Sequence, residues 1–482
     1  MMKKNKSIKI NFIMNAVLTM SSFIFPLITF PYISRILSPV GTGKVAFATS
    51  LITYFAMFAQ LGIPTYGIRS CAKVRDDRNE LSKVVHELLF INLIMSLISY
   101  MFFVAILFII PKLQEERNLY IIISLTILLN AIGMEWLYKG LEEYAYITIR
   151  SIAFKFIALI FMFLFVREQK DYTIYGGITI FASSASNVLN LINSHKYIDW
   201  KKQKGYCFKR HIRPILIFFA MSCATTIYTN LDTVMLGFMT TDKDVGYYNA
   251  AIKIKLILVS IVTSLGTVLL PRASYYVEHS LIGEFWNTSR KALNFVMVIA
   301  LPMMLYFILY AKEGIYFLSG TEYKGAILPM QIIMPTLLFI GLSNILGIQI
   351  LVPMGKEKIV LYSEIAGAGV DLLINALLIP SLHSTGAAVG TVIAEFIVLL
   401  FQYIYIKRYM NIENLFMNVQ FFKIVLALIL AYCITYIASK FYSSILETLV
   451  LSAVLFFGTY IICLWTVKEP LFTEIVTQVL KK

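Results

Sequence analysis

Four long apolar runs constrain this chain more than any other feature of its sequence. They are Phe12 to Ile33, Val84 to Ile110, Phe422 to Ala438 and Leu449 to Val467. Each run approaches or exceeds about 20 residues, the length at which a helix crosses the apolar core of a bilayer. Only 14% of the residues are charged, against roughly a quarter in an ordinary soluble protein. The sequence therefore predicts a membrane protein.

The rest of the chain divides into similar segments. Runs of about 20 mainly apolar residues, bounded by charge, Pro or Gly, predict about 14 membrane spans. The predicted limits are 10–37, 44–70, 84–110, 119–140, 148–166, 174–194, 213–238, 246–271, 288–311, 327–352, 359–380, 387–406, 422–440 and 448–467. These runs are continuously apolar, whereas barrel strands alternate in polarity over about ten positions. We therefore expect an all-α polytopic fold.

The longest connection between predicted spans runs from Ser194 to Arg213 and follows the sixth span. A weak internal repeat also divides the chain there, because Val40-Gly41 opens the second span as Val245-Gly246 opens the eighth. A parallel repeat of this kind places a cavity between two bundles. The predicted domains are an N-terminal six-helix bundle (1–194), a cytoplasmic linker (195–212), a second six-helix bundle (213–406), and two additional helices with a cytoplasmic tail (407–482).

Lysine and arginine residues predict the orientation of the chain, because they gather in cytoplasmic loops. With the N-terminus inside, roughly 30 basic residues fall on the cytoplasmic side and roughly 10 on the other. We expect a multi-pass inner-membrane protein of a bacterial cell with both termini in the cytoplasm. The net charge of +15 then faces anionic lipid headgroups, and no nucleic-acid partner is expected.

Catalytic and metal-binding motifs are missing from the sequence. It has no P-loop, His-Glu-x-x-His or Gly-x-Ser-x-Gly motif. Its five cysteines are widely spaced without a Cys-x-x-Cys pair, so we interpret them as reduced packing residues. We expect neither an enzyme nor a cofactor.

Three segments of the sequence resemble a known family. The segments are Phe30-Pro-Tyr-Ile-Ser-Arg-Ile-Leu-Ser-Pro-Val-Gly-Thr-Gly43, Leu61-Gly-Ile-Pro-Thr-Tyr-Gly-Ile-Arg69 and Asn230-Leu-Asp-Thr-Val-Met-Leu-Gly237. They resemble the first-helix exit, the second-helix exit and the seventh helix of the Wzx-type O-antigen and polysaccharide flippases, which belong to the multidrug/oligosaccharidyl-lipid/polysaccharide exporter superfamily. One departure concerns turn geometry: relatives often carry Gly in place of Ser38 and a bulkier residue in place of Thr42.

The resemblance implies a function that composition does not show. It implies movement of an undecaprenyl-diphosphate-linked oligosaccharide repeat unit, an O-antigen or capsule precursor, from the cytoplasmic to the periplasmic leaflet. The sugar would occupy a hydrophilic cavity, and the two bundles would alternate in access. A glycan polymerase and a chain-length regulator are the protein partners that such a role implies.

Ionisable residues within spans usually face a cavity or a partner, since each costs about 2.5–3.5 kcal/mol at mid-bilayer on insertion scales. Asp232 and Lys253 lie at similar depths in neighbouring spans and are a candidate ion pair. Asn249 shares a helical face with Lys253, while Lys255 lies off that face. These four residues predict either a cavity wall for a diphosphate or saccharide, or a buried structural bridge.

Three carboxylates of later spans suggest coupling to an ion gradient. Glu364 and Asp371 share one face of the eleventh span, and Glu395 lies in the next span. Carboxylates in a cavity of low dielectric bind protons more readily, so a proton or sodium gradient could bias one conformation. The alternative is that these groups are buried for packing.

Other polar residues are candidate substrate contacts. Arg35 and Arg69 lie at span ends, where guanidinium groups either bind phosphate or anchor the helix at the interface. Arg150 and Lys155 begin the fifth span, near the face from which substrate would load. Asn187, Asn190 and Asn193 form a stripe along the sixth span that offers hydrogen bonds either to saccharide hydroxyls or to a neighbouring helix.

Two other functions compete with the flippase hypothesis. A multidrug or small-molecule exporter of the same superfamily would share the architecture, but would need acidic and aromatic walls for a hydrophobic cation. A passive scaffold for glycan assembly would leave the intramembrane charges without a role. The basic residues favour the glycolipid, whereas Asp371 and Glu395 leave the exporter open.

Overall fold

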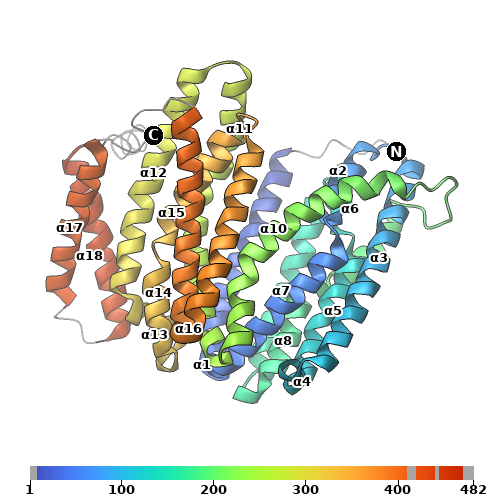
Figure 1. The fold of residues 1–482 in the computed structure, drawn as a ribbon, viewed down its shortest axis with the longest axis horizontal. Coiled ribbons are helices and arrows are strands. Elements are labelled where there is room, and N and C mark those ends of the chain that lie inside the picture. The colour runs from blue at the N-terminus through green and yellow to red at the C-terminus, as the bar shows by residue number, and fades with distance from the viewer. Residues whose placement is uncertain (1–7, 410–418, 440–443, 470–482) are drawn as a thin grey trace. The chain divides into compact units, whose positions relative to one another are not determined.

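The computed structural model describes residues 8–409, 419–439 and 444–469 (Figure 1). All regular elements within these ranges are helices, which confirms the predicted all-α class. Two compact units make up the chain, Met1–Gly246 and Tyr247–Lys482. The first unit therefore extends beyond the predicted linker 195–212 and includes the seventh predicted span, so the division into two six-helix bundles stays a prediction.

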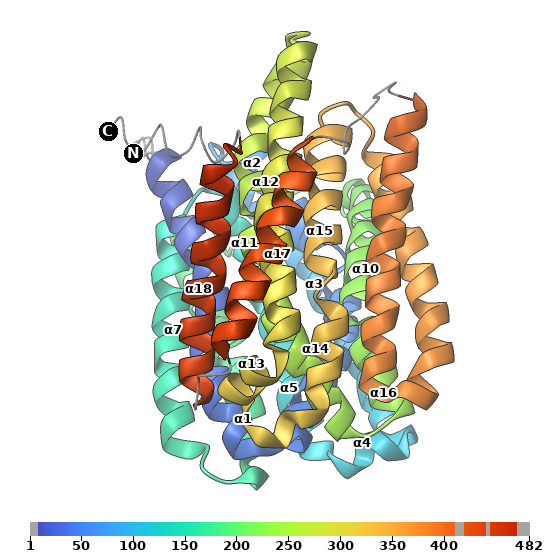
Figure 2. The same ribbon diagram turned by 90° about the vertical axis from the view of Figure 1, so that its left-hand side faces the viewer.

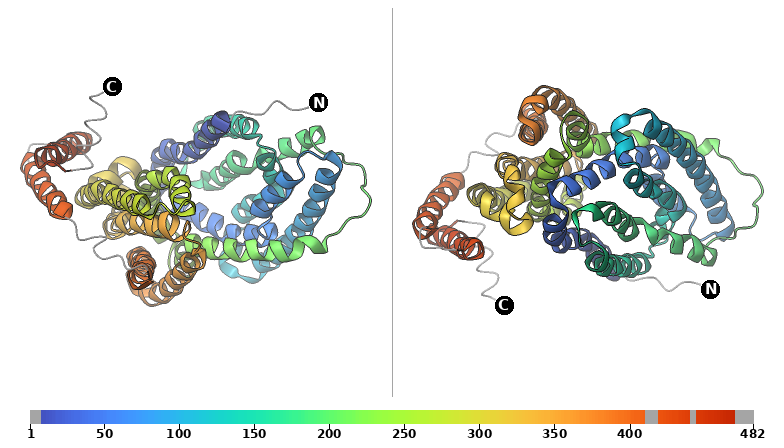
Figure 3. Two further views of the ribbon diagram at one scale, coloured as in Figure 1. Left: turned by 90° about the horizontal axis from the view of Figure 1, so that it is seen from above. Right: turned by 90° about the horizontal axis from the view of Figure 1, so that it is seen from below.

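Helices of the first unit pack closely around α1, which contacts α3, α5, α7, α8 and α10. The views from above and below look down many of the helices (Figure 3). The elements of this unit are α1 (Ile8–Gln60), α2 (Ile63–Lys73), α3 (Arg78–Ile109), α4 (Pro111–Glu115), α5 (Arg117–Gly133), α6 (Glu135–Gly140), α7 (Tyr144–Phe165), η1 (Gln169–Asp171), α8 (Tyr172–Ile180), η2 (Phe181–Ala185), α9 (Asn187–Asn193), η3 (Ser194–Lys196) and α10 (Lys209–Met239).

The second unit is built around a long bent helix, α16, which contacts α14, α15 and η5. The last two helices, α17 and α18, lie side by side as a pair (Figure 2). Its elements are α11 (Asp242–Glu278), which begins in the first unit, α12 (Ile282–Leu309), α13 (Ala311–Ser319), η4 (Thr321–Ala326), α14 (Ile327–Ile333), α15 (Thr336–Asn344), η5 (Ile345–Leu351), α16 (Glu357–Tyr409), α17 (Val419–Ser439) and α18 (Ile445–Thr466).

Two sharp bends separate predicted spans inside single long helices. Ser38 interrupts α1 with φ 58° and ψ 176°, between the predicted spans 10–37 and 44–70. His383 interrupts α16 in the same way, with φ 51° and ψ −129°, between 359–380 and 387–406. Among the described residues, nine helices are long and apolar enough to cross a membrane, or ten if the bent pair 321–351 is one span. The count of 14 spans therefore stays a prediction.

Glycines allow close contact beside the first bend. The position that a Cβ of Gly43 would occupy overlaps the carbonyl of Asp242, and that of Gly246 overlaps the carbonyl of Pro39. The start of α11 therefore lies directly on the bend of α1. Small residues permit such backbone contact between membrane helices, which gives Gly246 of the predicted repeat a packing role.

Candidate functional site

A polar cavity of about 370 Å³ lies among the helices of the first unit. Its wall comes from α1, the start of α2, α5, the α8–η2 junction and α10. The lining residues are Thr49, Ile52, Thr53, Ala56, Met57, Gln60, Gly62, Pro64, Ile123, Thr126, Asn130, Ile180, Ser183, Ser222 and Thr226. Its volume falls in the range of about 300–1,000 Å³ that is typical of small-molecule sites.

Several polar side chains of the wall lack protein partners. The Thr126 hydroxyl is fully buried and forms no hydrogen bond within the described part of the chain. The side chains of Thr49, Gln60, Ser222 and Thr226 also form none there, and all four line the cavity. Because unpaired polar groups are costly in a membrane interior, this wall is suited to water or to a ligand rich in hydroxyl groups.

None of the described residues that line this cavity is charged. Each polar residue that lines the cavity carries a hydroxyl or a carboxamide, and the remaining lining residues are apolar or glycine. Hydroxyls donate and accept hydrogen bonds, and carboxamides offer both kinds of group. The wall can therefore bind a neutral polar molecule without burying an unpaired charge.

A π-helical turn and an asparagine pair shape one side of the cavity. Ser183 lies within η2, a π-helix, and such turns are rare and frequent at functional sites. Asn187 donates a hydrogen bond from Nδ2 to Oδ1 of Asn130, at 3.0 Å. Its side chain lies flat against Gly133, where an added Cβ would approach Asn187 Cγ to 2.5 Å. Asn187 therefore positions Asn130, which lines the cavity, from behind the wall.

Asn190 has a different role from the one that the polar stripe suggested. Its side chain is fully buried and donates a hydrogen bond to the carbonyl of Gly133 at 2.6 Å. The backbone carbonyl of Asn190 accepts a hydrogen bond from the Tyr138 hydroxyl at 2.5 Å. Asn190 thus connects α9 to the neighbouring helices α5 and α6.

The predicted basic residues lie outside the cavity wall. Arg150 is buried in α7, 3.7 Å from the Glu135 carboxylate, while Lys155 donates to the hydroxyls of Ser21 and Ser22 at 2.8 and 3.0 Å. Arg35 is exposed and donates to the carbonyl of Pro31 at 2.6 Å.

Arg69 differs from the other basic candidates. It is exposed on α2 and forms no hydrogen bond or ion pair within the described ranges. Pro64 of the cavity wall lies five residues earlier on the same helix, about 7.5 Å along the axis at ~1.5 Å per residue. Among the candidate arginines, Arg69 is therefore the one whose guanidinium has no protein partner in the described ranges, and it lies on a helix that contributes to the cavity wall.

The residues predicted around Asp232 belong to different units. Asp232 is buried in α10 of the first unit. In the second unit, Lys255 is buried in α11, whereas Asn249 and Lys253 are partly exposed. The ion pair between Asp232 and Lys253 stays a prediction.

A second polar cluster lies between the two arms of α16. Asp371 and Asn375 are buried one turn apart on the first arm. They face Gly390 of the second arm. A Cβ added to Gly390 would lie 3.1 Å from Asp371 Oδ1. The adjacent Thr391 shares a hydrogen bond of 2.8 Å with the Tyr248 hydroxyl.

The other two carboxylates of the predicted coupling group differ in exposure. Glu395 is buried, one turn after Thr391 on the second arm. Glu364 is partly exposed, two turns before Asp371 on the first arm. The structure thus places Asp371 and Asn375 of the first arm against Gly390 of the second, but leaves Glu364 at a partly open position.

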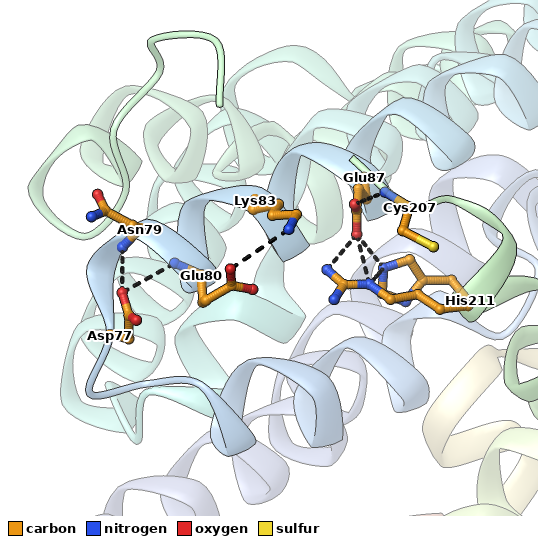
Figure 4. Close-up of polar contacts among 8 residues, drawn as sticks. Asp77, Asn79, Glu80, Lys83, Glu87, Cys207 and His211 are labelled. Carbon is orange, nitrogen blue, oxygen red and sulfur yellow. Dashed lines mark hydrogen bonds and ion pairs between the residues drawn. The ribbon is translucent and has the colours of Figure 1, made fainter. Parts of the chain in front are cut away.

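Sequence reasoning missed a buried ionic cluster around Glu87 of α3 (Figure 4). The side chain of Glu87 is fully buried and accepts hydrogen bonds from Arg210 Nη2 and from His211 Nε2, both at 2.6 Å. The backbone amide of Cys207 donates to its other oxygen. On the far side of the ring, His211 Nδ1 lies 2.8 Å from the Tyr66 hydroxyl of α2.

The sequence did contain a signal for this cluster. Glu87 is the one carboxylate in the apolar run Val84 to Ile110, and an ionisable residue within such a run predicts a partner. Its partners could not be identified from the sequence, because Arg210 and His211 are more than 120 positions away.

A known protein family matches more than half of this chain. The family described as polysaccharide biosynthesis protein matches residues 8–277, more than half of the chain. The chain belongs to this family. The match confirms the resemblance that the three sequence segments indicated.

Two bacterial relatives of this chain are described as candidate O-antigen transporters. A candidate O-antigen transporter of Escherichia coli strain K12 is 25% identical over 411 residues, which cover 84% of this chain and 99% of the relative. A protein of the same description from Shigella dysenteriae is 26% identical over 407 residues, which cover 79% of this chain and 95% of the relative.

Solved structures share the fold at low sequence identity. A lipid II flippase, MurJ, in an inward closed conformation matches with a TM-score of 0.73 and 16% identity, over 98% of this chain and all of that chain. An inward-facing multidrug transporter of the MATE family matches with a TM-score of 0.62 and 13% identity, over 83% and 98% of the two chains. This chain thus shares the helical fold of these two polytopic membrane proteins.

Proposed function

We propose that this protein is a flippase that moves a lipid-linked saccharide across the inner membrane of a bacterium. The cavity of the first unit carries the proposal, because several of its neutral polar side chains, Thr126 among them, have no protein partner within the described part of this membrane-embedded helical unit. The relatives described as O-antigen transporters, and the shared fold of a lipid II flippase, support the same class of cargo.

The saccharide portion of the substrate would occupy this cavity. Thr126, Ser222 and Gln60 supply hydrogen-bond donors and acceptors, while Ile52 and Ile123 supply apolar surface. A sugar ring has the same two properties, hydroxyls at its rim and C–H groups on its faces. A carboxylated sugar would be disfavoured, because the described wall offers no cation to balance its charge.

The diphosphate would bind at Arg69. Guanidinium groups form paired hydrogen bonds with phosphate oxygens, and Arg69 is exposed near the cavity without a protein partner in the described chain. Arg150 and Lys155 already contact Glu135 and the serines of α1, which leaves them less available. The lipid tail, an undecaprenyl chain by the family resemblance, would stay in the bilayer.

Transport would proceed by alternating access, from the cytoplasmic to the periplasmic leaflet, with both chain termini in the cytoplasm. Asp371 and Asn375 direct side-chain oxygens toward Gly390 in the second unit, so a sodium ion or a proton could bind there and bias the conformation. The partners would be the lipid-linked substrate, membrane lipids, and a glycan polymerase with its chain-length regulator.

Surface glycan in a deletion strain tests the proposal. Complementation with wild type should restore the glycan, whereas Thr126→Val should restore little of it, because this change removes a cavity hydroxyl while nearly keeping its shape. Thr435→Val is the matched control, since the Thr435 hydroxyl is buried in α17, donates to Ala431 within its own helix, and does not line the cavity. Protein levels in the membrane are measured for each variant.

Two outcomes separate the candidate functions. Loss of glycan together with accumulation of lipid-linked repeat units on the cytoplasmic face supports the flippase. Unchanged glycan in the deletion strain contradicts it and favours the multidrug exporter, although the described cavity wall has neither the acidic nor the aromatic residues that a hydrophobic cation would need.

A further inference from the structure

Hydrogen bonds hold the segment between α9 and α10 along the first turns of α3. Arg78 Nη2 donates to the carbonyl of His195 at 3.1 Å, and Ser82 Oγ accepts from the amide of Asp199 at 2.8 Å. His86 Nδ1 lies 3.0 Å from the Tyr206 hydroxyl. The segment therefore lies on α3 over most of its length, until Glu87 contacts the start of α10.

We infer that Glu87, Arg210, His211 and Tyr66 form an inner latch, which holds the start of α10 against α2 and α3 and must release before the cavity opens at this end. We assign this end to the cytoplasm from the distribution of basic residues. The inference rests on the proposed function, because a latch matters to a cavity that changes its access.

The latch joins three helices through the Glu87 carboxylate and the His211 ring. Glu87 comes from α3, Arg210 and His211 from α10, and Tyr66 from α2. Glu87 is fully buried, whereas the Arg210 side chain is 38% exposed. If α10 moves away, Arg210 keeps its water, but Glu87 loses both of its side-chain partners and keeps only the Cys207 amide, which is strongly unfavourable for a buried charge. The closed arrangement is therefore favoured until water or another group reaches Glu87.

Motion at the latch would reach the cavity wall through α10. His211 lies 11 residues before Ser222, which lines the cavity, so about 16 Å of helix at ~1.5 Å per residue separates them. Between His211 and Ser222, α10 lies against Gly62. A Cβ added to Gly62 would lie 2.5 Å from the amide nitrogen of Phe219. Gly62 is thus a contact point about which α10 could tilt.

The far end of α10 has a separate attachment. Lys112 of α4 donates to the carbonyls of Gly237 and Thr240 at the end of α10. Release of the inner latch would therefore leave α10 anchored at its other end. Movement would then be largest at the latch and would open the cavity on that side alone.

Accessibility of the cavity from each face of the membrane tests the latch. The five natural cysteines are replaced in the full-length chain, and Ser222→Cys introduces one thiol into the cavity wall. A membrane-impermeant maleimide is applied to inside-out and right-side-out vesicles. Glu87→Gln should raise the labelling rate about tenfold in inside-out vesicles, since hydrogen bonds to a charged group are worth more than those to a neutral one. The rate in right-side-out vesicles should not change.

Two further variants sharpen the test. Tyr66→Phe removes the hydroxyl that contacts His211 and should produce a smaller increase in the same vesicles. Glu80→Gln is the matched control, because Glu80 lies on α3 seven residues before Glu87 and pairs with Lys83 at 3.6 Å near the surface. This control should label at the starting rate.

Other results would overturn the inference. An unchanged rate in Glu87→Gln would show that the cluster does not limit access. A similar increase in both kinds of vesicle would show that Glu87 stabilises the unit as a whole, and an increase confined to right-side-out vesicles would reject the cytoplasmic assignment. Labelling needs no substrate, so this test can fail while the glycan experiment still supports the flippase.

Discussion

Two serines four residues apart on α1 have opposite backbone requirements. Ser34 has regular helical geometry, whereas Ser38 has a positive φ of 58° at the bend. This region of φ and ψ is nearly exclusive to glycine. The structure thus gives a physical reason for the glycine that relatives often carry in place of Ser38.

Glycine at these two positions should change stability in opposite directions. Ser38→Gly should raise the free energy of unfolding by about 1 kcal/mol through relief of backbone strain, while Ser34→Gly should lower it by a similar amount, as glycine does inside a helix. Thermal unfolding of the purified protein in detergent measures both. Equal destabilisation by the two changes would show that the lost serine side chains matter more than the backbone.

At the scale of elements, the contact between α2 and α10 has no spare room. Gly62 begins α2 with φ 72° and lies against the backbone of Phe218 and Phe219. Gly62→Ala should destabilise the protein by about 1–3 kcal/mol, because a Cβ is disfavoured at this φ and would also push α10 away.

A second glycine provides the matched comparison for this contact. Gly369 lies within α16, and a Cβ added there meets nothing within 4 Å. Gly369→Ala should therefore stabilise the protein by about 0.5–1 kcal/mol, as in an ordinary exposed helix position. Thermal unfolding compares the two variants, and a stable Gly62→Ala protein would contradict a tight contact.

Sequence patterns predicted the helices better than their interruptions. Each predicted span overlaps described helical structure, because a run of about 20 apolar residues is a strong signal. The bend at His383 falls between the predicted spans 359–380 and 387–406, whereas the π-helical turn at Ser183 lies inside the predicted span 174–194, where the sequence gives no comparable signal.

The cavity wall has few of the residues that stood out in the sequence. Asn187 was predicted to contact a saccharide or a neighbouring helix, and its side chain donates to Asn130. Thr126, which has no partner within the described residues, lies on a different helix that the polar stripe did not include. Charged residues are easily noticed in an apolar sequence, whereas hydroxyls that line a cavity look like those that bond to their own helix. Spacing within one helix cannot show which hydroxyls face the same space.

At the scale of the whole molecule, energy coupling depends on whether the buried carboxylate of α16 exchanges an ion. Asp371 is 2% exposed, Asn375 is buried one turn after it on the same arm, and Gly390 of the second arm lies against both. A bound cation would balance its charge in one conformation, and its release would allow another. Net transport should then follow the gradient of that cation.

Reconstituted vesicles can measure this coupling directly. Wild-type protein should translocate a fluorescent polyprenyl-diphosphate-linked sugar faster under an imposed sodium or proton gradient than without one, and Asp371→Asn should show the same rate in both conditions. Glu364→Gln is the control, because Glu364 is partly exposed on the same helical face, so it should keep the gradient response. If Asp371→Asn still responds to the gradient, the coupling carboxylate lies elsewhere, and Glu395 is the next residue to replace, since it is also buried on the facing arm.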